Sequence, residues 1–397
     1  MAANEIRRQL PTAHRVVLVE KNAQHAFAPS FLWLMTGDRE PGQICRPLAG
    51  LLRRGVELVH AEVTGIDTSR RKVRTSAAEI AYDHLIVALG ASLAPDAMPG
   101  LAEASHTFFT LEGSARLRDA LRSFSGGRIA IVVSAMPYKC PGAPHEGAML
   151  IADFFRRRGL TGKVDVHLFT PEPQPMPVAG PRLGEAVQGM LQSRGVEFHP
   201  LHRLMRVDPA AREMEFEKGT RAGYDLLVAV PPHRAPRVVV EAGLTNQAGW
   251  IPVDARTLRT NQDGVYAIGD VTSIPIPGRW KPDVPLMLPK AGVFAHAHAE
   301  VAARQVVAEV TGRACEAAFS GDGYCMLEAG GDLAGFAFGN FLAEPSPTLQ
   351  LRETGKFWHL GKVLFEKWWL APVGLRRSLI GSLVKAGGRF HGVPVSL

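Results

Sequence analysis

The stretch VSAMPYKCPGAPHEG, from Val133 to Gly147, lies where a strand turns into a helix. The run GGRIAIVV before it (126–133) predicts a buried parallel strand. The run APHEGAMLIADFFRRRG after it (143–159) has apolar residues at helical spacing and ends in glycine, which predicts a helix. KVDVHLFTPEP (163–173) predicts a second strand. This order of elements is typical of a dinucleotide-binding unit.

The turn of this unit differs from a nicotinamide site. Such a turn carries G-x-G-x-x-G, so that backbone N–H groups can approach a pyrophosphate at the helix N-terminus. Here the turn is bulky and holds Cys140 between Lys139 and Pro141. The sequence therefore argues against NADH as the electron donor. Two interpretations of Cys140 stay open: it reacts with a smaller substrate, or it packs.

The composition is that of a large enzyme. A chain of 397 residues with 46% hydrophobic residues can bury two or three domain cores. Its four cysteines have neither a disulfide-framework nor a zinc spacing, and no His/Cys/Asp cluster has metal-ligand spacing, so we expect no metal. The sequence shows no apolar run long enough to span a bilayer and no signal peptide, which predicts a cytoplasmic protein.

Positive charge is concentrated near the C-terminus. The chain has 45 basic and 38 acidic residues, a net charge of +7, and the residues from Lys356 onward hold seven Lys/Arg but one acid, Glu366. Aromatic residues alternate with these charges, and VGLRRSLIGSLVKAGGRF (373–390) places Leu375, Leu379 and Leu383 on one helical face. This predicts docking on an anionic membrane surface. The alternative is a helix packed on its own domain with a solvated basic face. Nucleic acid is not expected, because no binding motif accompanies the charge.

Three strand endings suggest a second ligand-binding edge. HRVVLVEKN (14–22) predicts a strand ending at Glu20, where an acid commonly accepts hydrogen bonds from a ribose. AYDHLIVALGAS (81–92) ends a strand at Ala88 and Gly90, and GVYAIGDV (264–271) ends one at Gly269 and Asp270. Glycine lets backbone approach a ligand closely, and Asp270 can accept a hydrogen bond from a ribityl hydroxyl.

Several segments together resemble the sulfide:quinone oxidoreductase and flavocytochrome c sulfide dehydrogenase branch of the flavoproteins with two dinucleotide-binding domains. The resemblance runs from about Glu20 to the Trp-rich C-terminal segment, and KCPGAPxE followed at long range by a second Cys is its most specific mark. The segments that carry it are YDHLIVALGAS, KCPGAPHEGAML, TPEPQPMPVAG, YDLLVAVPPHRAP, GVYAIGDV and PLMLPKAGVFAHAHAEVAA.

The resemblance implies a site built on FAD and a pair of redox cysteines, Cys140 and Cys325. Hydrosulfide would attack their disulfide, leaving a persulfide and a thiolate, and two electrons would pass through FAD to a membrane quinone. Glu146 matches a carboxylate proposed for proton handling, and Lys290 lies in the segment near flavin and quinone. The residues predicted to contact the cofactor are Glu20, Pro29, Val63, Ala88, Gly90, Gly269, Asp270 and Lys290.

The other cysteines and the histidines differ in their expected roles. A thiol at a helix N-terminus beside Lys139 should have a lowered pKa, which we expect for Cys140. Cys45 and Cys315 are interpreted as packing residues, and no cysteine lies between Cys45 and Cys140, where many quinone-reducing relatives carry a third one. The histidines that could move protons are His145, His199, His202 and His233, although a lone histidine is more often structural.

The start of the chain lacks one expected feature. Neither a first strand nor a glycine-rich turn precedes Glu20, and AANEIRRQLP (2–11) is typical of the end of the helix that follows such a turn. We expect a start site assigned too far downstream. The chain from Met1 would then bind little FAD, and an extension of about 20 to 30 residues would restore the phosphate site. The alternative is a genuine loss of the motif.

These observations predict an α/β protein with two Rossmann-like dinucleotide-binding domains and a C-terminal membrane-docking region. The predicted segments are a FAD domain over 1–125 and 246–315, a nicotinamide-like domain over 126–245, and a C-terminal region with the second redox cysteine over 316–397. The predicted function is oxidation of sulfide, or of a related small sulfur donor, with quinone as acceptor, peripheral on the inner face of the membrane. Two alternatives stay open: a type II NADH:quinone oxidoreductase and a non-enzymatic descendant that has lost FAD. A homo-oligomer is also an open alternative.

Overall fold

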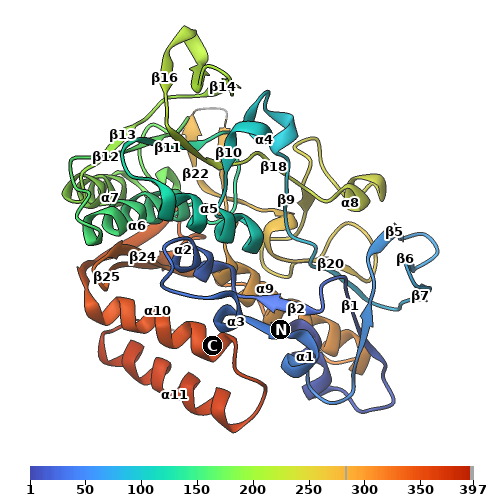
Figure 1. The fold of residues 1–397 in the computed structure, drawn as a ribbon. Coiled ribbons are helices and arrows are strands. Elements are labelled where there is room, and N and C mark those ends of the chain that lie inside the picture. Colours follow the sequence, from blue (N-terminus) through green and yellow to red (C-terminus); the bar gives the residue numbers. More distant parts are fainter. Residues whose placement is uncertain (282–283, 394–397) are drawn as a thin grey trace.

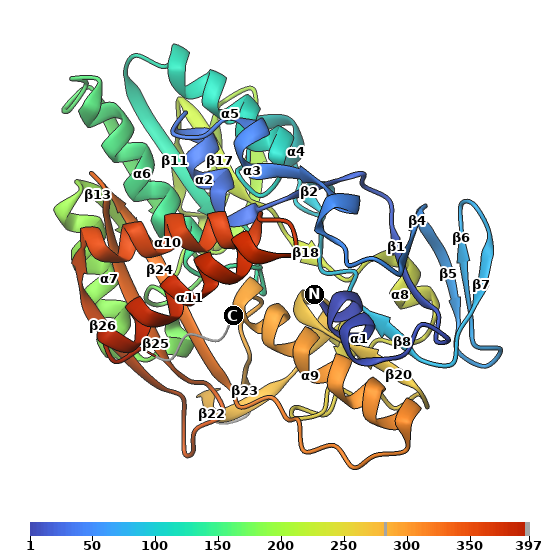
Figure 2. The same cartoon turned by 90° about the horizontal axis from the view of Figure 1, so that it is seen from below.

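The computed structural model describes residues 1–281 and 284–393 and has three parts (Figure 1). A parallel sheet with helices forms the second dinucleotide-binding domain, a split parallel sheet forms the first, and the C-terminal part packs across both. Figure 2 shows the two last helices lying along one side of the molecule, next to the sheet of the C-terminal part.

The second domain contains a five-stranded parallel sheet in the order β10-β17-β11-β12-β13. Its elements are β10 (Ser105–His106), α5 (Leu111–Ser123), β11 (Gly127–Val133), α6 (Ala143–Arg157), β12 (Val164–Phe169), α7 (Pro181–Ser193), β13 (Val196–His199) and β17 (Leu226–Val230). The predicted strand over 126–133 and the helix after it are present. Both faces of β11 are buried, because Ile129 and Ile131 pack toward α6 while Ala130 and Val132 pack in a second cluster. A hydrophobic run without alternation is typical of such a strand.

The first domain holds two parallel strand pairs, β1 with β4 and β20 with β8. Its elements are α1 (Ala2–Gln9), β1 (Val16–Glu20), β4 (Val56–His60), β5 (Val63–Asp67), β6 (Lys72–Thr75), β7 (Glu79–Ala81), β8 (Leu85–Val87), β20 (Val265–Ala267), η6 (Gly269–Val271) and α9 (Gly292–Thr311). Ile6 and Leu10, at the end of α1, pack in one cluster with Phe294 and Ala299 of α9. Of the predicted ligand-binding residues, Glu20 ends β1, Ala88 and Gly90 follow β8, Gly269 and Asp270 follow β20, and Val63 begins β5.

The remaining elements before the C-terminal part are short. They are β2 (Gln24–Ala26), η1 (Ala28–Ser30), α2 (Phe31–Met35), α3 (Pro41–Ile44), β3 (Cys45–Pro47), η2 (Leu48–Leu51), β9 (Ser92–Leu93), η3 (Pro95–Ala97), α4 (Leu101–Ala104), η4 (Pro177–Ala179), β14 (Leu204–Asp208), β15 (Glu213–Phe216), η5 (Glu217–Gly219), β16 (Arg221–Gly223), β18 (His233–Arg234), α8 (Arg237–Glu241), β19 (Ile251–Pro252), β21 (Thr272–Ser273), β22 (Pro275–Lys281) and β23 (Val284–Met287). The strand β10 pairs with β17 and thus joins the second sheet, although it precedes the predicted boundary at residue 125.

The C-terminal part is an antiparallel sheet covered by two helices. It comprises β24 (Asp322–Gly330), β25 (Leu333–Asn340), β26 (Thr348–Gly355), α10 (Lys356–Trp369) and α11 (Leu375–Phe390). The helix α10 contacts β24 and β25 on one side and α11 on the other. In Figure 1 the two helices lie side by side in red.

The outer surface of this helix pair agrees in part with the sequence prediction. Leu375, Leu379 and Leu383 are 85%, 67% and 64% exposed, so the predicted apolar face of α11 points to solvent. The predicted interfacial aromatic residues behave differently, because Trp368 is buried and Trp369 packs on Phe27. Within the described ranges, no helix is both long enough and apolar enough to cross a membrane.

A buried ion pair holds α10 against the connecting segment after β2. Glu366 is 0% exposed and its carboxylate lies 3.0 Å from the guanidinium of Arg39. The hydroxyl of Ser30 donates a hydrogen bond of 2.8 Å to the same carboxylate. Because Arg39 is mostly covered, loss of the carboxylate would leave its charge uncompensated.

We predict that Glu366→Ala lowers the free energy of unfolding by about 3 to 5 kcal/mol, because a buried charge loses its partner. Lys356→Ala, at an exposed position of the same helix, should change it by less than about 0.5 kcal/mol. Thermal melting of both variants measures the difference. Equal melting temperatures would show that α10 docks without this pair.

Candidate active site

The Cys140 turn lies at the C-terminal end of β11 and is fixed to the first domain. The Cys140 N–H donates a hydrogen bond of 2.6 Å to the carbonyl of Lys290, and Lys139 forms a parallel bridge with the same residue. Cys140 has φ = +57°, a conformation that a residue with a side chain rarely adopts. Such strain is most common at functional sites, where the surrounding structure holds it in place.

Cys325 reaches the same region from the C-terminal sheet. It lies on β24, and this strand packs on the first turn of α6. A Cβ atom on Gly142 would lie 3.3 Å from the Cys325 sulfur and 2.8 Å from a methyl carbon of Leu327. Both Cys140 and Cys325 are free thiols that pack against one hydrophobic cluster. The structure thus brings together two cysteines that are far apart in the sequence.

A buried ion pair lies beside the two thiols. The Lys362 ammonium of α10 donates a hydrogen bond of 2.7 Å to the carboxylate of Glu146, and both side chains are almost fully covered. A Cβ atom on Gly142 would lie 3.7 Å from the other Glu146 oxygen, which places this carboxylate next to the turn. Lys362 was not among the predicted site residues. Its position in the basic C-terminal segment suggests a surface charge, and only the fold reveals its buried partner.

The protonation of the thiols differs from the prediction. Burial and, to a smaller extent, the nearby Glu146 carboxylate raise the pKa of Cys140 to about 12, although Lys362 opposes both effects. Burial also raises the pKa of Cys325 well above its ordinary value. The expected lowering by Lys139 and the helix N-terminus was wrong, because loss of solvation outweighs these effects. Burial likewise raises the pKa of Glu146, and Lys362 limits that rise.

Lys290 connects the Cys140 turn to the Gly269-Asp270 corner. Its ammonium donates hydrogen bonds of 2.7 Å to the Asp270 carbonyl and 3.0 Å to the Thr272 carbonyl, and it lies 3.4 Å from the ring centre of Trp250. Burial lowers the pKa of Lys290 to about 8, and Asp270 opposes this effect. Lys290, Asp270 and the Cys140 turn therefore form one contiguous group.

The predicted cofactor residues gather at one edge of the first domain. Glu20, Ala88, Gly90, Gly269 and Asp270 lie at or just beyond the C-terminal ends of the parallel strands, the edge where such sheets bind ligands, and Val63 begins the strand that follows β4. Pro29 lies apart, in η1 on the connecting segment.

Two observations test whether this edge fits FAD. The Asp270 Oδ1 atom is buried without a hydrogen-bond partner, which fits a ligand that supplies a hydroxyl group. A Cβ atom on Gly90 would meet nothing within 4 Å, so the backbone there is open to close approach. The described residues therefore fit the ribityl part of a flavin.

The histidines named from the sequence lie in different environments. Burial lowers the pKa of both His145 and His233 to about 4, so each imidazole is neutral at physiological pH. His145 contacts the Pro141 carbonyl at 3.2 Å through Nδ1, and its buried Nε2 atom has no partner.

The other two cysteines lie away from this group. Cys45 is a residue of the strand β3, which pairs with β2, and Cys315 lies in the loop after α9, so neither belongs to the group around Cys140.

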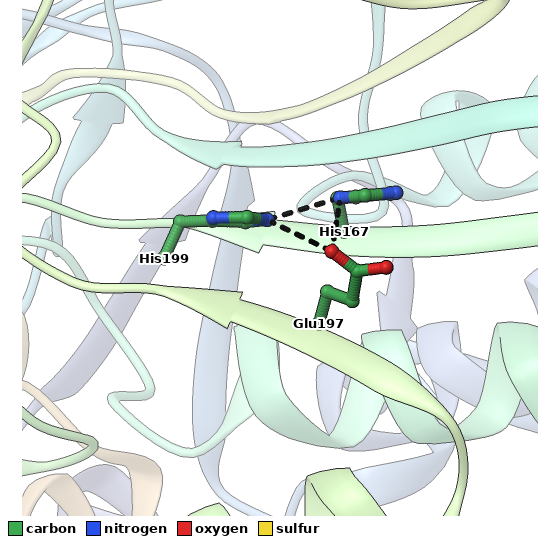
Figure 3. Close-up of side chains that lie close together, drawn as sticks. All are labelled: His167, Glu197 and His199. Atoms are coloured by element: carbon green, nitrogen blue, oxygen red, sulfur yellow. Dashed lines mark hydrogen bonds and ion pairs between the residues drawn. The ribbon is translucent and has the colours of Figure 1, made fainter.

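A second polar cluster lies on the far strands of the second sheet. His167 of β12 and Glu197 and His199 of β13 point toward one another (Figure 3). The sequence spacing did not indicate this cluster, because His167 and His199 are separated by 32 residues. The alternating patterns H-x-F and E-x-H on two adjacent parallel strands are the signal that could have found it.

Fold and site together define a flavoprotein-type oxidoreductase with two dinucleotide-binding domains. Residues 1–302 match the model of the pyridine nucleotide-disulphide oxidoreductase family, and the chain belongs to this family. This confirms the predicted oxidoreductase and the predicted fold class.

Relatives within the family agree with the predicted branch. The chain is 28% identical to a mouse mitochondrial sulfide:quinone oxidoreductase over 279 residues, which cover 66% of this chain and 61% of that protein. It is 25% identical to a sulfide-quinone reductase of Aquifex aeolicus over 370 residues, 90% of this chain and 85% of that one. The X-ray structure of the sulfide:quinone oxidoreductase from Aquifex aeolicus aligns with a TM-score of 0.83 at 23% identity, covering 97% and 89% of the two chains. The resemblance to this branch is thus confirmed, while the chain spans about three fifths of the mouse protein.

We predict that Cys140 of the folded, reduced protein reacts slowly with iodoacetamide at pH 8. A thiol with a pKa of about 12 has a thiolate fraction roughly 10³ lower than one at the ordinary value of 9.0. Cys315, which lies in the loop after α9 and is partly exposed like Cys140, serves as the internal comparison outside the cysteine group. Mass spectrometry of timed samples measures both rates. Labelling of Cys140 as fast as that of Cys315 would contradict the inferred protonation.

Proposed function

We propose that this protein is a FAD-dependent enzyme that oxidises sulfide, or a related small sulfur donor, through Cys140 and Cys325 and passes electrons to a quinone. The observation that carries the proposal is the meeting of the Cys140 turn and the Cys325 strand beside the buried Glu146–Lys362 pair. The names of the curated relatives support the choice of sulfide and quinone. When FAD is bound, it supplies two-electron transfer between the sulfur site and the quinone.

The proposed sulfur chemistry starts from a Cys140–Cys325 disulfide. Hydrosulfide attacks one sulfur, so that one S–S bond forms and another breaks, which yields a persulfide on one cysteine and a thiolate on the other. The sulfide sulfur is oxidised and the disulfide is reduced. Loss of two electrons would then join the persulfide sulfur to the other cysteine as a trisulfide and release one proton, and the quinone would take up the two electrons with two protons to become the quinol.

The residues around the thiols control the protons of this reaction. Burial disfavours a thiolate at both cysteines, so the reduced pair takes up protons readily. Glu146 has a raised pKa and lies next to the turn, which suits a carboxyl group that accepts a proton from the incoming sulfur donor and releases it again. Lys362 holds this carboxyl in place.

A type II NADH:quinone oxidoreductase is the alternative, and the second domain argues against it. β24 covers the N-terminus of α6 at Gly142, where a nicotinamide cofactor would place its phosphates. Glu172, the acid after β12, is buried and accepts hydrogen bonds of 2.9 Å from Tyr138 and Thr170. This acid is therefore used within the domain and does not face a ribose.

Docking on an anionic membrane surface completes the proposal. Leu375, Leu379 and Leu383 form an exposed apolar row on α11, and Arg376 and Arg389 flank it. Apolar side chains that enter the interface and cations that attract anionic lipids act together in such helices. A peripheral position of this kind, on the inner face of the membrane, would give the site access to a membrane quinone.

We predict that Cys140→Ser and Cys325→Ser each abolish anaerobic reduction of the flavin by sulfide, because neither variant can form the disulfide that sulfide attacks. The loss should exceed a factor of about 10³, as for removal of a covalent catalyst. The flavin absorbance during a sulfide titration measures it. Cys45→Ser and Cys315→Ser are matched controls that should react like the unmodified protein.

Two outcomes of that titration would contradict the proposal. Reduction at the unmodified rate in Cys140→Ser would remove the cysteine pair from the mechanism. Bleaching by NADH, together with no response to sulfide, would favour the NADH:quinone alternative.

A second prediction concerns the exposed row of α11. Replacing Leu375, Leu379 and Leu383 together by Ser should abolish binding to vesicles that contain anionic lipid, because most of the apolar contact is lost. Binding of the unmodified protein should weaken as salt rises, since salt screens the basic residues. Vesicle sedimentation measures both effects.

The control replaces an equally exposed leucine far from the helix pair. Leu201 is 71% exposed in the second domain, and Leu201→Ser should leave vesicle binding unchanged. Salt-insensitive binding that survives the triple substitution would show that α11 does not dock on membranes.

A further inference from the structure

The cluster of His167, Glu197 and His199 is built by strand register. His167 of β12 lies directly opposite Glu197 of β13, and His199 follows two residues later on the same face. Side chains at these positions point to one side of a parallel sheet. The neighbours Val166, Leu168 and Phe198 point to the other side, into the core below α6.

The three potential ligand atoms have the spacing of a metal site. Nδ1 of His167 lies 3.0 Å from Nε2 of His199 and 3.4 Å from Oε2 of Glu197, and the remaining separation is 3.8 Å. A circle through three points with these separations has a radius of about 2.0 Å, which equals the usual Zn–N and Zn–O bond lengths. The three atoms lie at the corners of one small triangle, as the dashed lines in Figure 3 show.

Aromatic packing holds the two imidazoles in place. The His199 ring stacks on Phe169 with centroids 4.3 Å apart, and the rings of His167 and His199 are nearly parallel. Oriented ligands lose little conformational freedom on binding, which favours affinity. A water molecule can complete the coordination, since Glu197 is 64% exposed and leaves one side open.

Other charged groups face the cluster. Arg128 of β11 and Asp165 of β12 lie on the same face, and their opposite charges offset each other. The backbone N–H of Arg128 donates to Asp225, and its guanidinium contacts the Gly223 carbonyl, which directs this cation toward the far edge. Glu197 then supplies the negative charge next to the two imidazoles.

From this geometry we propose that His167, Glu197 and His199 form a binding site for a divalent transition metal ion of the zinc type. Two imidazole nitrogens and one carboxylate oxygen suit Zn²⁺, Co²⁺ or Ni²⁺, whereas Mg²⁺ and Ca²⁺ prefer oxygen ligands throughout. The ion would join β13, the edge strand, to β12. The site is independent of the cysteine pair and of the proposed sulfide oxidation.

The test uses the full-length protein with Zn²⁺ and with Co²⁺ as a spectroscopic probe. Wild-type protein should bind one more equivalent of Zn²⁺ than Glu197→Gln or His199→Gln after equilibrium dialysis. The affinity of either variant for this equivalent should fall by at least about tenfold. Co²⁺ should give a visible absorption band typical of low coordination number in the wild type and in His202→Gln, but not in Glu197→Gln or His199→Gln. His202→Gln is the matched control, because His202 packs on His199 without belonging to the triad.

Three results would overturn the assignment. The first is that wild type, Glu197→Gln and His199→Gln bind Zn²⁺ with the same stoichiometry and affinity. The second is that His202→Gln loses as much Zn²⁺ binding as the two triad variants. The third is that the wild type binds no Zn²⁺ at micromolar concentration. Melting curves support the assignment if Zn²⁺ raises the melting temperature of wild type and His202→Gln but leaves that of Glu197→Gln unchanged. Because Glu197 is largely exposed, Glu197→Gln should fold normally and keeps the test decisive.

Discussion

The close packing of β24 on the first turn of α6 determines the character of the site. Gly142 makes it possible, because a Cβ atom there would lie 2.8 Å from Leu327, a distance that real Cβ atoms do not show. Gly142 has an ordinary helical φ of −76°, so glycine is needed for space and not for backbone conformation. The contact between β24 and Gly142 therefore covers the N-terminus of α6, where an anion could otherwise bind, and places the Cys325 thiol there instead.

The same packing explains the unusual protonation of the site. Two thiols, one carboxyl group and one ammonium group share a region that β24 and α10 shield from water. Desolvation favours neutral thiols, while the Lys362 ammonium keeps its charge because the carboxylates of Glu146 and Glu328 outweigh the effect of burial on its pKa. In the proposed sulfide oxidation, a site of this kind would couple electron transfer to proton uptake, since burial favours thiols over thiolates at both cysteines.

The sequence predicted local structure well where one element carries the whole signal. The strand before Cys140, the helix after it and the apolar row of α11 are each visible in a single stretch of residues. The resemblance supplied Cys325 and Glu146. Lys362 could not be predicted, because its buried role depends on a partner 216 residues away. The pKa of Cys140 was mispredicted for a related reason: the sequence shows Lys139 beside the thiol but not the strand that covers it. His167 and His199 likewise meet only through the register of two strands.

The helix pair at the C-terminus connects the proposed membrane surface to the sulfur site. α11 presents its leucines to solvent, whereas α10 carries Lys362 and Glu366 on its inner side, where they bind residues of the second domain and of the segment after β2. Phe365 and Trp369 fill the space between α10 and Phe27 of that segment. Two of the aromatic residues that the sequence suggested as membrane anchors, Phe365 and Trp369, thus pack between α10 and the segment after β2. The helix α10 thus contacts both α11 and, through Lys362, the carboxylate that lies next to Cys140.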